Sequence, residues 1–512
     1  MEKIMSNLHM EKIKCSQKLQ FVIEEDKNIS DQSPDIVKIL MEDGDISVEE
    51  IRPGKEFVEL RGKLYYKILY LTDEKEKKLH KISGEIPWEE KVRIDGMEPS
   101  DSVFVEDFLE DMRSSCINSR KINIRALAGL KLVVRENYDE EVVNRIEEKE
   151  IEQKKENLTY SEVRVDRKDK LRMKEEFELP PSFPPIAQLL FHFIELNKWE
   201  AKPLEDHISI QAEMTVFLIY RSNKEEEDIK TYETTVKYLA NLECPGSNTQ
   251  LYESIIPVIK SKQLNVKQDE DGEDRILESE IVTELLIRLW EEKQIELVTD
   301  IYGTQEQIMP VYREGEYCRR GEKQQIRLKL SKTVRVPASY PKILQIYCTK
   351  TCEPYLEQIQ QEGKVFLQGS IPFSIFYLTE SEEETYGSLK EQIEFLQELE
   401  DGNTSEYEVW GMVQQCKTIL LDGEETEVKI NILLEVQPVH YRKKKYLQEV
   451  RKEESLREKR NQQPSMAVYR ATSKESLWEI GKKYGIAVES IRSVNQLEDE
   501  VLQNGQKILL IR

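Results

Sequence analysis

The side chains that could do acid–base, nucleophilic or metal chemistry are scattered along the 512 residues. The histidines form no His-Glu-x-x-His motif; they are His9, His80, His192, His207 and His440. Cys348 and Cys352 have C-x3-C spacing, which alone is too little for a zinc site. The sequence contains no Walker loop and no Gly-x-Ser-x-Gly elbow. We therefore predict no catalytic residue, no metal site and no cofactor.

One alternating pattern recurs three times and organises the chain. From Val58 to Tyr70, every second residue is apolar or small, which is the period of a β-strand with one face on a core. The pattern returns from Ile208 to Tyr220 and from Val365 to Tyr377. We expect the opposite face to meet water. The repetition predicts three copies of one β-rich module.

The middle of each long strand carries a tiny residue, which is Gly62, Ala212 or Gly369. This predicts a bend, a bulge or a close approach of another backbone. Pro372 in the third copy has no N–H for a sheet ladder, and it predicts a sheet edge or a bulge. After each long strand, an apolar-x-aromatic triplet keeps the same register, at 86–88, 236–238 and 393–395.

The chain is acidic, with 99 Asp and Glu against 75 Lys and Arg and a net charge of -24. This disfavours a general surface for nucleic acid or anionic membranes. The cysteines do not recur at matching repeat positions, which predicts reduced thiols in a cytosolic compartment; they are Cys15, Cys116, Cys244, Cys318, Cys348, Cys352 and Cys416. No apolar stretch has the length of a signal peptide core or of a membrane span, and so we expect the protein to stay where it is made.

Composition and the repeats together predict the domain order. We expect β modules at 1–138, 158–299 and 321–440, and a small C-terminal domain at 466–512. The nearly all-charged stretch 139–157 predicts a solvated linker or exposed helix, and 300–320 predicts a connector. The basic stretch 441–465 predicts a flexible linker that keeps the last domain mobile.

The last forty-seven residues predict a β-α-α-β order. Ser476 and Glu479 have capping-box spacing, and Gly485 supplies a helix stop. The residues that carry a further resemblance are Tyr469, 476–480, 484–486, Ile491, Asn495 and 505–508. This pattern resembles the LysM domain, a family known for binding N-acetylglucosamine polymers between two loops. The corresponding loops here are 472–477 and 495–500.

The chain departs from the LysM pattern where a sugar would sit. The usual Gly-Asp-Ser/Thr is Lys474-Glu475-Ser476, which disfavours glycan binding and favours a protein ligand. The residues predicted for the partner surface are Arg470, Lys474, Glu475, Ser476, Asn495 and Gln496, with Asn495 also expected to satisfy backbone groups. The residues predicted for the LysM core are Tyr469, Leu477, Trp478, Ile480, Ile491 and Ile508.

The three modules resemble the SPOCS domain, in which a Pro-x-Ile/Val segment precedes a long alternating strand that ends in Ile/Leu-x-Tyr. Three such modules followed by one LysM domain resemble spore coat morphogenetic proteins. The resemblance implies a scaffold in the mother-cell cytoplasm, at the forespore surface. It also implies that the protein joins the coat-nucleating ATPase, stage IV sporulation protein A, to other spore coat proteins and coat layers, with the LysM domain as the contact.

Three functions of different classes remain open from the sequence. The first is a non-enzymatic coat scaffold whose LysM domain binds a protein. The second is a cell-wall protein that binds peptidoglycan or N-acetylglucosamine, which titration with chitin oligomers would reveal. The third is a hydrolase within the repeats, which would need a catalytic carboxylate pair in a concave pocket.

Overall fold

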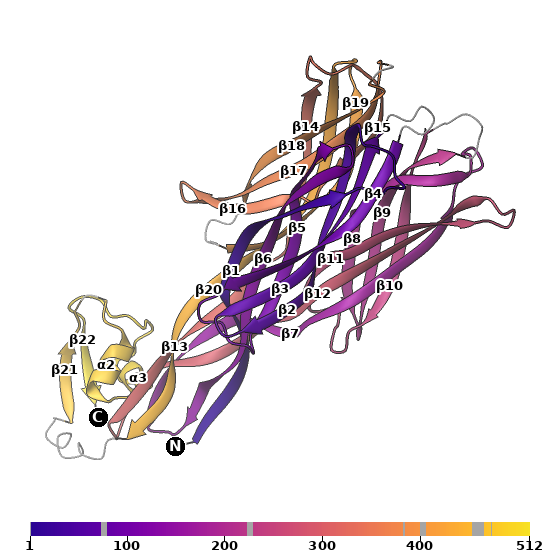
Figure 1. The fold of residues 1–512 in the computed structure, drawn as a ribbon. Coiled ribbons are helices and arrows are strands. Elements are labelled where there is room, and N and C mark those ends of the chain that lie inside the picture. Colours follow the sequence, from indigo (N-terminus) through magenta and orange to yellow (C-terminus); the bar gives the residue numbers. More distant parts are fainter. Residues whose placement is uncertain are drawn as a thin grey trace.

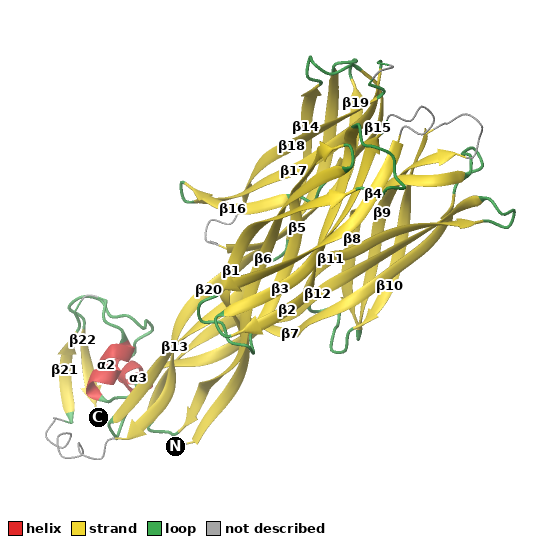
Figure 2. Ribbon diagram, viewed as in Figure 1, coloured by secondary structure: helices red, strands yellow, loops and turns green. Residues whose placement is uncertain are grey.

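The computed structural model describes residues 2–72, 79–222, 229–381, 384–399, 406–452, 465–472 and 474–511. The described part consists almost wholly of antiparallel strands, and its helices lie in the C-terminal domain (Figure 2). The predicted mainly β fold class is therefore confirmed. The strands form a broad head that narrows into a stalk, and the C-terminal domain lies beside the far end of the stalk (Figure 1).

The head and the stalk are built from twenty strands within the described residues. The first module contains β1 (Glu2–Asn28), β2 (Lys38–Gly54), β3 (Phe57–Leu71), β4 (Leu79–Arg93), β5 (Ser102–Asn118) and β6 (Lys121–Glu147). The second contains β7 (Ile151–Glu178), β8 (Ile186–Leu204), β9 (His207–Ser222), β10 (Ile229–Glu243), β11 (Tyr252–Gln268) and β12 (Asp274–Gly303). The third contains β13 (Ile308–Arg320), β14 (Gln324–Arg335), β15 (Ile343–Thr351), β16 (Tyr355–Gln361), β17 (Lys364–Thr379), β18 (Tyr386–Leu399), β19 (Glu406–Leu420) and β20 (Glu425–Lys452).

The three modules share one topology, as the repeated pattern predicts. In the first module, β3 lies between β2 and β4, and β6 lies between β1 and β5 in a second sheet. The second module has β9 between β8 and β10, and β12 between β7 and β11. In the third module, β13 with β14 replaces the first strand, and β15 with β16 replaces the second.

The three long alternating segments are the central strands β3, β9 and β17. Their predicted apolar faces are buried between the two sheets of each module, as with Val58, Leu60 and Leu64 in β3. An alternating strand buries one face at every second residue, and here the second sheet covers that face. Each module therefore has its own sandwich core.

The tiny residue in each long strand makes room for the aromatic residue of the following strand. The directly paired residues are Gly62 and Trp88, Ala212 and Tyr238, and Gly369 and Phe395. A Cβ at Gly62 would collide with the backbone oxygen of Ser47 and with the Trp88 ring. The predicted close approach of another backbone is therefore confirmed at Gly62, and at Gly369 the close neighbour is the Phe395 ring.

Pro372 does not lie at a sheet edge, so the prediction of an edge strand is wrong. Strand β17 is central, with β18 on one side and β15 and β16 on the other. The neighbouring strand is interrupted between Thr351 and Tyr355, opposite the proline. Because the ladder is already broken there, the missing N–H of Pro372 leaves no partner strand unpaired.

A second apolar core lies between the modules, and each module contributes the same positions to it. Leu69, Ile219 and Phe376 directly precede the last tyrosine of the three long strands and are fully buried. The strands before them contribute Met41, Phe191 and Cys348. The expectation that this face meets water is therefore wrong near the end of each strand, because neighbouring modules cover it. The modules pack around a shared centre, as subunits of a trimer do.

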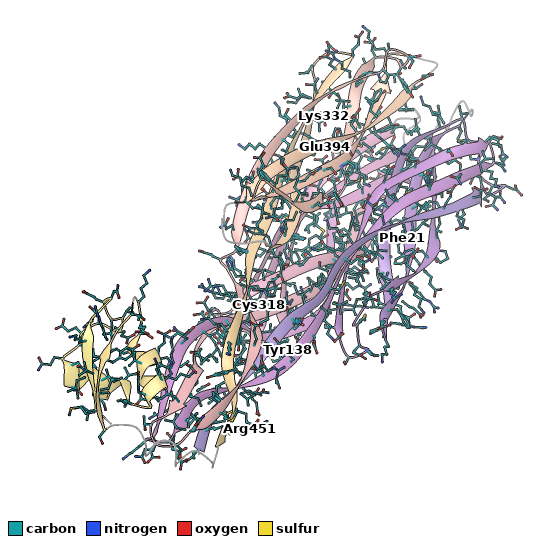
Figure 3. All side chains as sticks on the ribbon, turned by 90° about the vertical axis from the view of Figure 1, so that its left-hand side faces the viewer. Phe21, Tyr138, Cys318, Lys332, Glu394 and Arg451 are labelled. Carbon is teal, nitrogen blue, oxygen red and sulfur yellow. The ribbon has the colours of Figure 1, made fainter. Side chains whose placement is uncertain are left out.

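The stalk consists of three two-stranded ribbons. The first half of β1, the first half of β7 and the whole of β13 pair with the ends of β6, β12 and β20, respectively. All three ribbons contribute to its core, including Leu8, Val142, Leu158, Leu297, Tyr317 and Tyr446. Figure 3 marks Tyr138 and Cys318 where the head narrows, and Arg451 towards the end of the stalk.

Two predicted domain boundaries are wrong, because both segments belong to the stalk. Residues 139–157, predicted as a charged linker or helix, form the ends of β6 and β7 with a turn between them. Residues 300–320, predicted as a connector, belong mostly to β12 and β13. The many charged residues of these segments suggested a linker. They lie in strands of two-stranded ribbons, which expose about half of their side chains to solvent. Within the predicted linker 441–465, strand β20 continues to Lys452, and residues 453–464 lie outside the described residues.

The C-terminal domain has the predicted β-α-α-β order. Its elements are β21 (Met466–Arg470), α2 (Leu477–Tyr484), α3 (Val488–Asn495) and β22 (Lys507–Ile511), and the two strands pair antiparallel. The predicted helix signals at the ends of α2 are confirmed, since Ser476 forms the capping box with Glu479 and Gly485 ends the helix at φ 63°.

Candidate interaction site

The predicted partner surface of the C-terminal domain divides into exposed and half-buried residues. Arg470, Lys474 and Gln496 are exposed, whereas Glu475, Ser476 and Asn495 are half-buried. The exposed side chains are available to a partner, and the contacts of the half-buried ones show what holds the loops in place.

Glu475 and Ser476 organise the first loop. The Glu475 carboxylate accepts hydrogen bonds from the Tyr469 hydroxyl at 2.9 Å and from the Thr472 N–H at 2.8 Å. These two donors, the Thr472 N–H first, hold the pKa of Glu475 below its ordinary value. Ser476 accepts from the Glu479 N–H at 3.2 Å, and the Glu479 carboxylate accepts from the Ser476 N–H at 3.0 Å. Both residues therefore stabilise the loop as well as lining it.

Lys474 lies at the tip of this loop with a φ of 66°. This left-handed conformation favours glycine, the residue that the LysM pattern usually has there. The loop therefore keeps a glycine-like backbone while presenting a long cationic side chain to solvent.

Asn495 fastens the second loop. Its amide donates to the Ile491 carbonyl at 2.9 Å and to the Leu509 carbonyl at 2.8 Å, and its oxygen accepts from the Leu509 N–H at 2.6 Å. The prediction that Asn495 satisfies backbone groups is confirmed. Gln496 follows at φ 53° and ends α3. Its exposed side chain is the better candidate for contact with a partner.

The predicted LysM core is confirmed with one exception. Leu477, Ile480, Ile491 and Ile508 are at most 2% exposed, and Tyr469 packs against them. Trp478 does not join this cluster, although it was predicted to. It is half-buried on the outer side of α2, facing the stalk.

Trp478 belongs instead to an interface between α2 and the end of β12. Its indole Nε1 donates to Asp300 at 2.8 Å, and its ring lies 4.9 Å from the Tyr302 ring. Lys482 also donates to Asp300, at 2.6 and 2.7 Å. A Cβ at Gly481 would collide with the Tyr302 hydroxyl, and so only a glycine lets the helix approach this closely.

Electrostatics strengthen this interface. Burial alone would raise the pKa of Asp300, but hydrogen bonds from Lys482, Tyr312 and Trp478 outweigh it and lower the pKa below its ordinary value of 3.8. The Tyr302 hydroxyl donates to the Ile486 carbonyl at 2.9 Å. Contacts from α2 and from the turn after it therefore fix the C-terminal domain on the stalk.

The sequence did not single out Asp300 or Tyr302, which it placed in the predicted connector. Their partners in the C-terminal domain lie 176 or more residues further along the chain, and no local pattern links such distant positions. The signal that remained was Trp478, an aromatic residue beside Gly481 and Lys482 on a short helix.

The histidine and cysteine side chains, which could take part in chemistry, have the following surroundings in the fold. His192 is half-buried beside the Lys67 ammonium group at 3.1 Å, and desolvation followed by this positive charge lowers its pKa to about 3. All seven cysteines lie in described segments and are free thiols. Within the described ranges, no group of three or more His, Cys, Asp or Glu residues could hold a metal ion. Neither described helix is long and apolar enough to cross a membrane.

Two family models match the chain. The model described as SipL, SPOCS domain matches residues 35–117, within the first module, and the LysM domain model matches residues 469–510. No curated protein and no solved structure matches. The chain therefore carries a SPOCS domain and a LysM domain, a combination that fits a sporulation protein associated with the spore coat.

Proposed function

We propose that this chain, with its SPOCS domain and terminal LysM domain, is a non-enzymatic scaffold of the spore coat. It acts in the mother-cell cytoplasm at the forespore surface. Its LysM domain binds a protein, stage IV sporulation protein A, and so links this coat-nucleating ATPase to the other coat layers.

The observation that carries the proposal is the way the LysM domain sits on the stalk. Helix α2 is used for docking through Trp478 and Gly481, while the loop residues Lys474 and Gln496 stay exposed. A fixed domain with free loops supports a binding module held at a set distance from the head. Such preorganisation reduces the entropy lost when a partner binds.

The chemistry of the free loops supports a protein partner over a neutral sugar. Lys474 is cationic, and the second loop carries exposed Glu498, Asp499 and Glu500. Charges of both signs side by side suit a partner with a complementary charge pattern, which gives specificity and a faster association rate.

The test is a pull-down from sporulating cells with the full-length chain as bait. We expect the wild type to recover stage IV sporulation protein A and Lys474→Glu to lose it with the fold intact. Arg93→Glu is the matched control, because Arg93 is exposed on the head and pairs only with Asp95 among the described residues. Failure of the wild type to recover any coat protein would contradict the proposal.

The alternative is a cell-wall protein that binds peptidoglycan or N-acetylglucosamine. One observation keeps it in view, because the stalk contacts α2 and the turn after it, whereas Lys474 and Gln496 in the two loops are exposed. Titration of the full chain with chitin oligomers decides this point. Saturable binding at micromolar concentrations would favour the alternative, and its absence would exclude it.

A further inference from the structure

A large cavity lies along the shared centre of the three modules. Its volume is about 2080 Å³, larger than the roughly 300–1,000 Å³ of most small-molecule sites. The strand before the last one of every module lines it, with 104 and 106–114 of β5, 254–259 of β11 and 406–413 of β19. The cavity is therefore a feature of the assembled modules that no single module could form.

Five charged residues from all three modules meet where the head narrows into the stalk. This neck cluster consists of Glu11, Arg135, Arg288, Arg320 and Glu408. Arg135, Arg288 and Glu408 also line the cavity, and so one side of the neck cluster faces it. Three guanidinium groups against two carboxylates leave one positive charge in excess.

Arg288 and Arg320 form the hydrogen bonds to the carboxylates of Glu11 and Glu408. Arg288 donates to both oxygens of Glu11 at 2.6 Å and to Glu408 at 3.2 Å. Arg320 donates to Glu11 and to Glu408, both at 3.2 Å. These hydrogen bonds satisfy the two acids without Arg135.

Arg135 is the arginine without a hydrogen-bonded acceptor. Its side chain is 8% exposed, and its guanidinium forms no hydrogen bond within the described part of the chain. Its nearest acids are Glu11 at 3.5 Å and Glu408 at 3.7 Å, beyond good hydrogen-bond distance, and it stacks over the Phe104 ring. Burial and the neighbouring Arg288 both lower its pKa. A buried guanidinium that has acids nearby but no hydrogen-bonded acceptor is incompletely satisfied.

Other acids near the cavity do not supply the missing acceptor. Glu106 pairs with Lys131, and Glu435 pairs with Lys323. Glu316 and Glu406 line the cavity and are more exposed than Arg135, but in the described structure neither is ion-paired with it.

We propose that the cavity along the shared centre of the modules holds a ligand with an oxyanion group, which is a phosphate or a carboxylate. Arg135, beside Arg288 at the neck cluster, binds this group. The planar guanidinium matches either group with two parallel hydrogen bonds. The bound anion would neutralise the excess charge, and the ligand would contact all three modules at once. A ligand that binds only the assembled head stabilises it.

The test uses the full-length protein and inorganic phosphate as the probe. Isothermal titration and thermal unfolding are measured at constant ionic strength, with sodium chloride replaced by phosphate or, in a parallel arm, by acetate. We expect saturable binding and a raised unfolding temperature in at least one arm, and the stronger arm identifies the source of the oxyanion. Arg135→Gln should weaken that binding by about tenfold or more, the effect of losing a charged hydrogen bond.

Two variants complete the test. Arg135→Lys keeps the charge without the planar fork and should bind with intermediate affinity. Arg93→Gln, on the exposed head surface, should bind as the wild type does. Should Arg135→Gln fail to fold, the wild-type titration still decides. The proposal is overturned if neither anion binds saturably to the wild type, or if folded Arg135→Gln binds as tightly as the wild type.

Discussion

At the scale of single residues, Lys474 places a long cationic side chain on a backbone conformation that favours glycine. Its φ of 66° is the conformation that glycine adopts without strain, and a side chain there costs about 1 kcal/mol. The strain is local, because Glu475 and Ser476 fix the rest of the loop through their own hydrogen bonds. The cationic side chain is therefore retained at a cost in stability.

Lys474→Gly should raise the stability of the LysM domain by about 1 kcal/mol, since the strain disappears. Lys474→Ala is the matched control, because it removes the same charge and keeps the strained backbone. Hydrogen exchange of the LysM amides measures the stability, and the pull-down measures the partner contact. We expect both variants to lose the contact equally, and a stability gain in the alanine variant would contradict this argument.

At the scale of elements, the three long strands pair a tiny residue with an aromatic one. The ring lies over the neighbouring strand, and so the size of the small residue sets how closely the ring approaches. Ala212 in the second module already carries a Cβ opposite Tyr238, whereas the Cβ of an alanine at Gly62 would meet the backbone of Ser47.

Gly62→Ala should destabilise the first module by about 1–3 kcal/mol, because a backbone oxygen cannot move aside cheaply. The reverse change in the second module, Ala212→Gly, should cost only about 0.5–1 kcal/mol from added chain entropy. Chemical denaturation of the full-length variants compares the two. Equal costs would show that the two modules are packed alike at this position.

The contact between helix α2 and strand β12 should depend on pH through Asp300. The Asp300 pKa is lowered by its partners, and so the docked state gains stability above the ordinary pKa of 3.8 and loses it as pH falls through the lowered value. We expect small-angle X-ray scattering to show a docked LysM domain at neutral pH and a released one in acid. Asp300→Asn should release the domain at neutral pH, and a variant that stays docked would contradict the assigned role.

At the scale of the whole molecule, the modules depend on each other. Leu69, Ile219 and Phe376 look outward from their own sandwiches and are buried only because the other modules cover them. A module expressed alone would expose this surface to water.

Phe376→Asp should separate the modules and lower stability by more than about 3 kcal/mol, because the new carboxylate would be buried without a partner. Leu396→Asp is the matched control, since Leu396 lies in the same sheet and is 54% exposed. Limited proteolysis and thermal unfolding compare the two. Equal behaviour of these variants would argue against a core shared by the three modules.

The sequence predicted the elements that have a repeating pattern of side chains along the chain. Alternation located the three long strands, and helix caps and the LysM pattern located α2 and α3 with most of the small core. Contacts between segments that are distant in the chain produce no comparable sequence pattern. Leu69 looked like one more residue on a solvent face, Trp478 like a core residue, and the charged ends of β6 and β7 like a linker, because the surface that covers each lies in another part of the chain.

Joining three modules in one polypeptide has a consequence for the neck cluster. In a trimer of identical subunits, every side chain near the axis would occur three times, and a set of three arginines and two glutamates from unlike positions could not form there. A single chain escapes this constraint and carries one LysM domain for every three modules. Its assembly is also unimolecular, and so dilution leaves the head intact where a true trimer would dissociate.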